Sequence, residues 1–146
     1  MLFRTHIAFA VFVYILAFKT GIIHHSFLSL MLILVSAIIP DMDAVNSFTG
    51  RRLPAIGRFL AHRGIFHSLL LPIVAVTLIS TLSVELGLVF FLGYTSHLLL
   101  DSLTPSGVRL FYPLKFRIKG RLATGSLQDK LIFWLFVALN CVGVAL

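Results

Sequence analysis

The stretch VELGLVFFLGYTSHLLLD, residues 84–101, joins a membrane-compatible helix to two polar side chains at its end. Residues 84–100 approach the ~20 mostly apolar residues that a membrane-spanning helix needs. Asp101 follows His97 by four residues, so both side chains lie on one face of the predicted helix. The helix dipole disfavours a carboxylate at a C-terminal end, and a bound cation would reverse that penalty. The pair is therefore a candidate metal site, although a simple His–Asp hydrogen bond also fits the spacing.

Composition predicts that most of the chain lies in a membrane. Of the 146 residues, 59% are hydrophobic and 12% are charged, and the mean hydropathy is +1.04. A water-soluble domain of this size could not bury so much apolar surface. The apolar runs predict membrane-spanning helices at residues 6–23, 26–40, 65–83, 84–100 and 131–146. We expect an all-α membrane protein, a compact bundle of four to five transmembrane helices with a basic cytoplasmic loop, in a single domain over residues 1–146.

The positive charges predict the orientation of this bundle. The chain has 12 Lys and Arg residues against 5 Asp and Glu, which gives a net charge of +7. If the N-terminus is cytoplasmic, every Lys and Arg except Lys19 falls on the cytoplasmic side, as membrane proteins prefer. Anchoring against anionic lipid headgroups accounts for these charges, so nucleic acid is not expected as a partner. We predict an integral inner or plasma membrane protein whose partners are membrane lipids.

The basic loop alternates apolar and cationic side chains over residues 114–122. A period of two predicts an extended strand or hairpin. The favoured interpretation is a segment that rests on lipid headgroups, and the alternative is a wall that holds an anionic substrate near the site. The loop ends at SLQD, residues 126–129, which fits a capping box. Asp129 is therefore interpreted as a helix cap rather than as a catalytic residue.

Two further segments place polar side chains beside predicted helix ends. PDMD at residues 40–43 follows the second apolar run, where Asp after Pro is also ordinary turn chemistry. HRGIFHS at residues 62–68 leads into the third run. A continuous helix would set His62 and His67 about 140° apart. We therefore place His62 on the loop and His67 in the first helical turn, where both can face one centre.

The predicted topology brings acidic and histidine side chains from several helices to one membrane face. Imidazole and carboxylate ligands together suit zinc foremost, with manganese or iron as alternatives, and one or two ions. His24, His25 and Glu85 fall on the predicted outer side and are interpreted as polar interface residues. The residues expected together at the cytoplasmic face are His6, Asp41, Asp43, His62, His67, His97 and Asp101.

In these motifs the chain resembles the YdjM-like family, LexA-regulated inner-membrane proteins described as metal-dependent hydrolases. The resemblance rests on the early His6, on PDMD and HRGIFHS, and on GYTSHLLLDSLTPSGV at residues 93–108 followed by LFYP at 110–113. It implies a membrane-bound metal-dependent hydrolase. The spacing of His97 and Asp101 is also similar to the His-x-x-x-Asp of zinc-dependent phospholipases C, which is an analogy only.

We predict an enzyme of the hydrolase class that cleaves a lipid or lipid-linked phosphoester at the cytoplasmic face. Asp43 is expected as general base or further ligand, and Arg63 as the cation that neutralises a phosphoryl oxygen or as an interface anchor. The alternative is a membrane carrier or sensor that binds a divalent metal without hydrolysis, but the predicted spans show no polar trail across the membrane. The expected metal ligands are His6, which also suits a proton shuttle, Asp41, His62, His67, His97 and Asp101.

Overall fold

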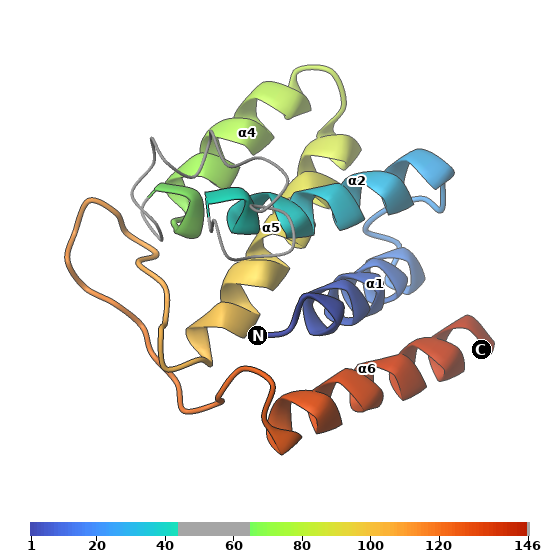
Figure 1. The fold of residues 1–146 in the computed structure, drawn as a ribbon. Helices are drawn as coiled ribbons and strands as arrows, with labels where there is room; N and C mark the ends of the chain where they lie inside the picture. Colours follow the sequence, from blue (N-terminus) through green and yellow to red (C-terminus); the bar gives the residue numbers. More distant parts are fainter. Residues whose placement is uncertain (44–64, 146) are drawn as a thin grey trace.

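The computed structural model describes residues 1–43 and 65–145, and within them the chain is helical. Its α-helices are α1 (Phe3–Lys19), α2 (Phe27–Ile38), α4 (Leu70–Ser80), α5 (Val84–Ser102) and α6 (Leu127–Ala145). Two short 3-10 helices are η1 (Ile39–Asp43) and η2 (Ile65–His67). Figure 1 shows α1 and α6 side by side and running in the same direction, with α2 antiparallel to α1. The prediction of an all-α chain is confirmed for the described residues.

The largest departure from the predicted helices is in the third apolar run, residues 65–83. This run divides into η2 and the shorter α4. The Ser68 hydroxyl donates to the Ile65 carbonyl at 2.7 Å, which closes the 3-10 turn. The Leu69 amide donates to the Leu110 carbonyl of the basic loop at 2.9 Å. The prediction that His67 occupies the first turn of the third helix is therefore wrong, because tertiary bonds hold His67 in η2.

Helix α5 is the central helix of the bundle, because it packs against α1, α2 and α4. Tyr94 and Leu98 on α5 belong to a buried apolar cluster that also includes Val108. Gly93 allows α5 to approach α2 closely, since a Cβ at this position would collide with the Ile33 carbonyl. This close approach brings the end of α2 beside the polar end of α5.

Among the described residues, α5 and α6 are long and apolar enough to cross a membrane, while α2 and α4 are apolar but shorter. Helix α6 packs along α1 (Figure 1). Much of its remaining apolar surface is exposed. Trp134 and Leu135, for example, are 64% and 55% exposed. Apolar surface of this extent suits hydrocarbon rather than water. The structure thus supports a helical membrane protein, and the number of spans stays a prediction.

The basic loop between α5 and α6 folds back against the end of α5. Val108 and Ile118 exchange two backbone hydrogen bonds, of 2.9 and 3.0 Å, in an isolated antiparallel bridge. The Gly120 amide donates to the Thr104 carbonyl at 3.0 Å. Over the part of the chain that the structure describes, this bridge is the only strand pairing, so within the predicted strand or hairpin at residues 114–122 only Ile118 is paired, and its partner Val108 lies outside that stretch. These bonds anchor the loop directly after Asp101.

Candidate metal centre

Asp101 is the point at which three histidines from separate elements meet. It lies in the last turn of α5 and is only 3% exposed. Its Oδ1 lies 3.3 Å from His6 Nε2 of α1, and 2.9 Å from the amino nitrogen of Met1. Its Oδ2 lies 3.5 Å from His67 Nε2 of η2 and 3.8 Å from His97 Nε2 of its own helix. Residues far apart in the chain are thus gathered around one carboxylate.

The orientation of His97 is fixed by a backbone carbonyl of the neighbouring helix. His97 Nδ1 lies 2.8 Å from the Ala37 carbonyl oxygen near the end of α2. A carbonyl only accepts hydrogen bonds, so Nδ1 carries a proton, and in the neutral ring Nε2 carries a lone pair. His97 Nε2 is buried and has no hydrogen-bond partner among the residues that the structure describes. It faces oxygens of Asp101 and Asp41, each 3.8 Å away.

Asp41 lies in η1, the short helix that follows α2. It completes the cluster, which consists of His6, Asp41, His67, His97 and Asp101. Its side chain is 21% exposed, which makes it the most accessible carboxylate of the group. Burial raises the pKa of the Asp41 carboxyl above its ordinary value, because a charged carboxylate loses hydration there. A bound cation would remove that cost and keep the carboxylate ionised.

The distances within the cluster are close to those of a metal site. Two sets of three residues each offer ligand atoms that all lie within 4.8 Å of one another. Ligands on a tetrahedral zinc ion with bonds of ~2.0–2.1 Å lie roughly 3.3 Å apart, so small side-chain shifts would suffice. His97 belongs to both sets, which are His6, His97 and Asp101, and Asp41, His67 and His97.

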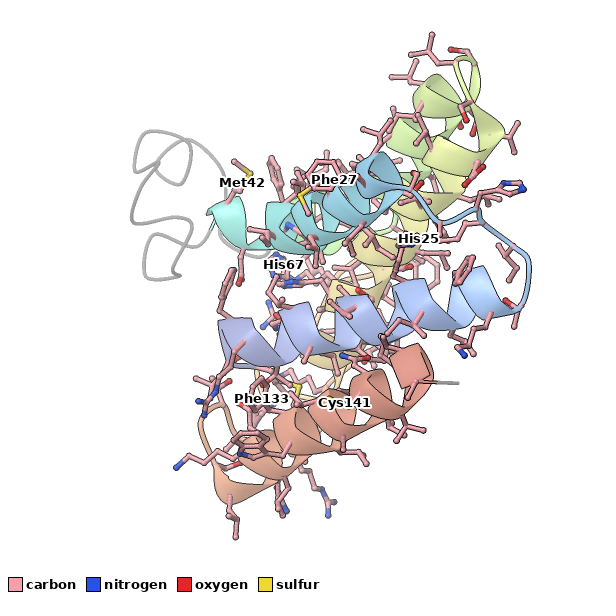
Figure 2. All side chains as sticks on the ribbon, turned by 90° about the vertical axis from the view of Figure 1, so that its right-hand side faces the viewer. His25, Phe27, Met42, His67, Phe133 and Cys141 are labelled. Atoms are coloured by element: carbon pink, nitrogen blue, oxygen red, sulfur yellow. The ribbon has the colours of Figure 1, made fainter. Side chains whose placement is uncertain are left out.

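The imidazole rings have distinct relative orientations. The rings of His6 and His97 are stacked, with centroids 3.9 Å apart and planes 12° from parallel. The ring of His67 stands edge-on to His97 at 5.7 Å and 73°. Figure 2 shows His67 over the first turns of α1. All three rings are nearly inaccessible to solvent, with exposures of 1–2%.

Tyr94 and the Ala37 carbonyl position the cluster, and sequence reasoning overlooked both. The Tyr94 hydroxyl donates to the Phe66 carbonyl at 2.6 Å and so holds the backbone next to His67. Tyr94 is fully buried and precedes His97 by three residues on α5. A tyrosine at that spacing was a usable signal, because a buried hydroxyl needs a partner. The role of a backbone carbonyl leaves no trace in the sequence.

Asp129 has a structural role larger than the predicted cap. The Ser126 hydroxyl accepts from the Asp129 amide at 3.3 Å, as a capping box requires. The Asp129 carboxylate instead accepts from the Leu2 amide at 3.0 Å and from the Thr5 hydroxyl and Gly125 amide, both at 2.8 Å. We call these three bonds the Asp129 clasp. The clasp ties the start of α6 to the start of α1, one residue from His6.

Some predicted site residues are not part of the described cluster. His62 and Arg63 lie outside the described residues, and so does the side chain of Asp43, the last residue of η1.

The predicted outer residues lie away from the cluster, at the opposite end of α1. His24 Nδ1 lies 3.0 Å from a carboxylate oxygen of Glu85 at the start of α5. His25 Nδ1 lies 2.7 Å from the Tyr14 hydroxyl. Figure 2 places His25 toward the far end of α1 from His67. Their separation from the cluster agrees with the prediction.

Comparison with known proteins gives one family and a few relatives. The family model described as "YdjM inner membrane protein" matches residues 1–146. The inner membrane proteins YdjM of Escherichia coli (strain K12) and Shigella flexneri are each 35% identical over 100 residues, which cover 59% of this chain and 50% of theirs. The uncharacterized protein YvsG of Bacillus subtilis (strain 168) is 32% identical over 108 residues, 67% of this chain and 66% of that protein. The chain spans about half the length of the two YdjM proteins, and no solved structure matches.

Proposed function

Since this chain belongs to the YdjM inner membrane protein family, it is a membrane protein, and we propose that it is a metal-dependent hydrolase of phosphoesters. In this proposal His6, Asp41, His67, His97 and Asp101 hold the metal, with zinc foremost. The site faces the cytoplasm, according to the distribution of Lys and Arg along the chain. The proposed substrate is a lipid or lipid-linked phosphoester.

The orientation of His97 is the observation that carries the metal proposal. A His–Asp hydrogen bond donated by His97 would need a proton on Nε2, but in the neutral ring the bond to Ala37 keeps the single proton on Nδ1. In the neutral ring Nε2 therefore directs a lone pair toward oxygens of Asp41 and Asp101, each 3.8 Å away. A divalent cation bound between them would be coordinated by all three groups. A carbonyl that accepts from the other ring nitrogen is the usual support of a metal-binding histidine.

The chain's own residues have separate roles in the proposed reaction. A divalent ion, when bound, polarises a phosphoryl oxygen and lowers the pKa of water. His67 and His97 hold the buried side of the site, and the half-buried Asp41 faces the side that substrate reaches. Asp43 as general base and Arg63 as charge-neutralising group remain predictions from the sequence.

An apolar groove between α1 and α5 favours a substrate with a hydrocarbon tail. The groove has a volume of about 270 Å³ and lies between α1 and α5. Phe9 and Val13 follow His6 by three and seven residues, so all three share one face of α1. An acyl chain in this groove would lead its headgroup toward His6. The lining residues are Phe9, Val13, Leu92, Thr95, Ser96 and Leu99.

Metal analysis combined with an activity screen tests the proposal. The purified protein in detergent is compared with His97→Ala and Asp101→Ala, and with His25→Ala as a control histidine at the other end of α1. We expect stoichiometric metal and phosphoesterase turnover in the wild type and in His25→Ala, and loss of both in the two site variants. Bound metal without turnover on soluble and lipid phosphoesters would favour the carrier or sensor alternative. A wild type that binds no divalent metal would overturn both functions.

A further inference from the structure

We propose that the cluster holds two metal ions bridged by the carboxylate of Asp101. His6 binds the first ion, and His67, His97 and Asp41 bind the second. This inference rests on the proposed metal site and adds its number of ions and the assignment of each ligand. The orientations of the Asp101 carboxylate and of the imidazole rings favour two ions.

The two oxygens of Asp101 face different histidines. His6 Nε2 approaches Oδ1 at 3.3 Å, while His67 Nε2 and His97 Nε2 approach Oδ2 at 3.5 and 3.8 Å. A carboxylate that binds a single ion through one oxygen would gather all its fellow ligands around that oxygen. Here the ligands divide between the two oxygens, as they do around a bridging carboxylate.

The stacking of His6 on His97 disfavours a single ion shared by these two rings as they are oriented. The lone pair of an imidazole nitrogen lies in the plane of its ring, so the ion that it binds lies close to that plane. The two rings are within 12° of parallel and their centroids are 3.9 Å apart. Two nearly parallel, separated planes have no nearby point in common. The ring spacing also matches the ~3.5–4 Å between the ions of two-metal sites.

The ligands divide into a larger set around the second ion and a smaller set around the first. The second ion would receive nitrogens of His67 and His97 and oxygens of Asp41 and Asp101, a complete set of four for zinc. His67 stands edge-on to His97, so their ring planes intersect and can share an ion. The first ion would receive His6 and Oδ1 of Asp101 from the described residues, and would take the place of the Met1 amino group that lies 2.9 Å from Oδ1. We therefore expect the second ion to bind more tightly.

Metal stoichiometry and manganese spectroscopy test the number of ions. The protein is stripped with chelator, loaded with Zn²⁺ or Mn²⁺, and measured by elemental analysis and electron paramagnetic resonance. We expect two ions per chain in the wild type, with a spin-coupled signal from the manganese form. His6→Gln should keep one ion with an uncoupled signal. Asp101→Asn should lose coupling and lower the affinity for both ions by at least tenfold.

Control variants separate failure of this inference from failure of the proposed function. His25→Ala should keep two coupled ions, and thermal unfolding of each variant reports whether the bundle still folds. One ion per wild-type chain at saturation, or two ions retained in His6→Gln, would overturn the two-ion arrangement while the metal-dependent function stands. A wild-type chain that binds no ion would overturn both.

Discussion

At the scale of single residues, the proposed metal site at the C-terminal end of α5 depends on the orientation of each ligand side chain. Spacing in the sequence indicates that His97 and Asp101 share a helix face, and the structure has them on one face. Only the structure shows that Ala37 fixes the tautomer of His97. The carbonyl belongs to another helix, and every residue type has one. Ligand identity is thus readable from sequence, whereas ligand orientation depends on tertiary contacts.

Tyr94→Phe should weaken the metal site without removing a ligand. The change removes the bond from the Tyr94 hydroxyl to the Phe66 carbonyl and so frees the backbone beside His67. Loss of a bond that orients a ligand costs about tenfold in metal affinity, and the unsatisfied carbonyl costs about 1–3 kcal/mol of stability. Competition with a chromophoric chelator measures the affinity, and thermal unfolding measures the stability.

Tyr14→Phe is the matched control for this change. The Tyr14 hydroxyl bonds His25 and the Ser26 carbonyl at the opposite end of α1. We expect Tyr14→Phe to alter stability but leave metal affinity unchanged. Equal effects of the two substitutions on affinity would show that Tyr94 has no special relation to the site.

At the scale of elements, the site depends on how closely two helices approach. The apolar runs predict where the helices are, and the helix boundaries in the structure differ by a few residues. These runs do not predict η2, because the hydrogen bonds that hold it and the following residue come from Tyr94 and Leu110, far along the chain. The residues that permit close packing, such as Gly93, are recognised only once the neighbouring helix is known.

Gly93→Ala should separate α2 from α5 and disturb the bond between Ala37 and His97. The added methyl group would meet the Ile33 carbonyl, which is backbone and cannot swing away. Overpacking of this kind costs about 1–3 kcal/mol, and we expect a parallel loss of metal affinity. Thermal unfolding in detergent and metal competition measure the two effects.

Gly143→Ala on α6 provides the comparison for Gly93→Ala. A methyl group there meets only the side chain of Ile15, which can adjust. Its expected cost is smaller, with no change in metal affinity. If Gly93→Ala kept wild-type affinity, the distance between α2 and α5 would not govern the site.

Asp129→Asn should loosen the junction between α1 and α6. A neutral amide cannot accept three hydrogen bonds as strongly as the carboxylate that receives Leu2, Thr5 and Gly125. Hydrogen bonds to a charged group contribute about 1.5–3 kcal/mol each, so we expect a loss of about 2–3 kcal/mol. Denaturant unfolding measures it. Ser126→Ala, which removes only the cap bond, should cost about 1 kcal/mol, and a larger cost than that of Asp129→Asn would contradict the clasp.

At the scale of the whole molecule, α6 is the helix most open to its surroundings. In the described structure few residues of α6 are buried, whereas about half of those of α5 are. From their apolar residues alone, both helices are predicted to be transmembrane spans. Packing distinguishes them, because α5 is surrounded by other helices and α6 has α1 on one side.

The fluorescence of Trp134 should report lipid contact of α6. Trp134 is the only tryptophan in the chain and is 64% exposed. In reconstituted vesicles we expect strong quenching by lipids brominated on their acyl chains and weak quenching by aqueous iodide. The opposite pattern would place this face of α6 in water or against another protein.

The Asp129 clasp also has a consequence for the order of events during synthesis. Thr5 and Asp129 are 124 residues apart, so a ribosome that adds ~5–20 residues per second makes Asp129 roughly 6–25 s after Thr5. During that interval α1 lacks the carboxylate that fixes its start. His6 likewise has no contact with Asp101 until Asp101 has been synthesised. The described ligands are all synthesised once Asp101 has been made, whereas the clasp that fixes the start of α1, next to His6, forms only after Asp129 has been made.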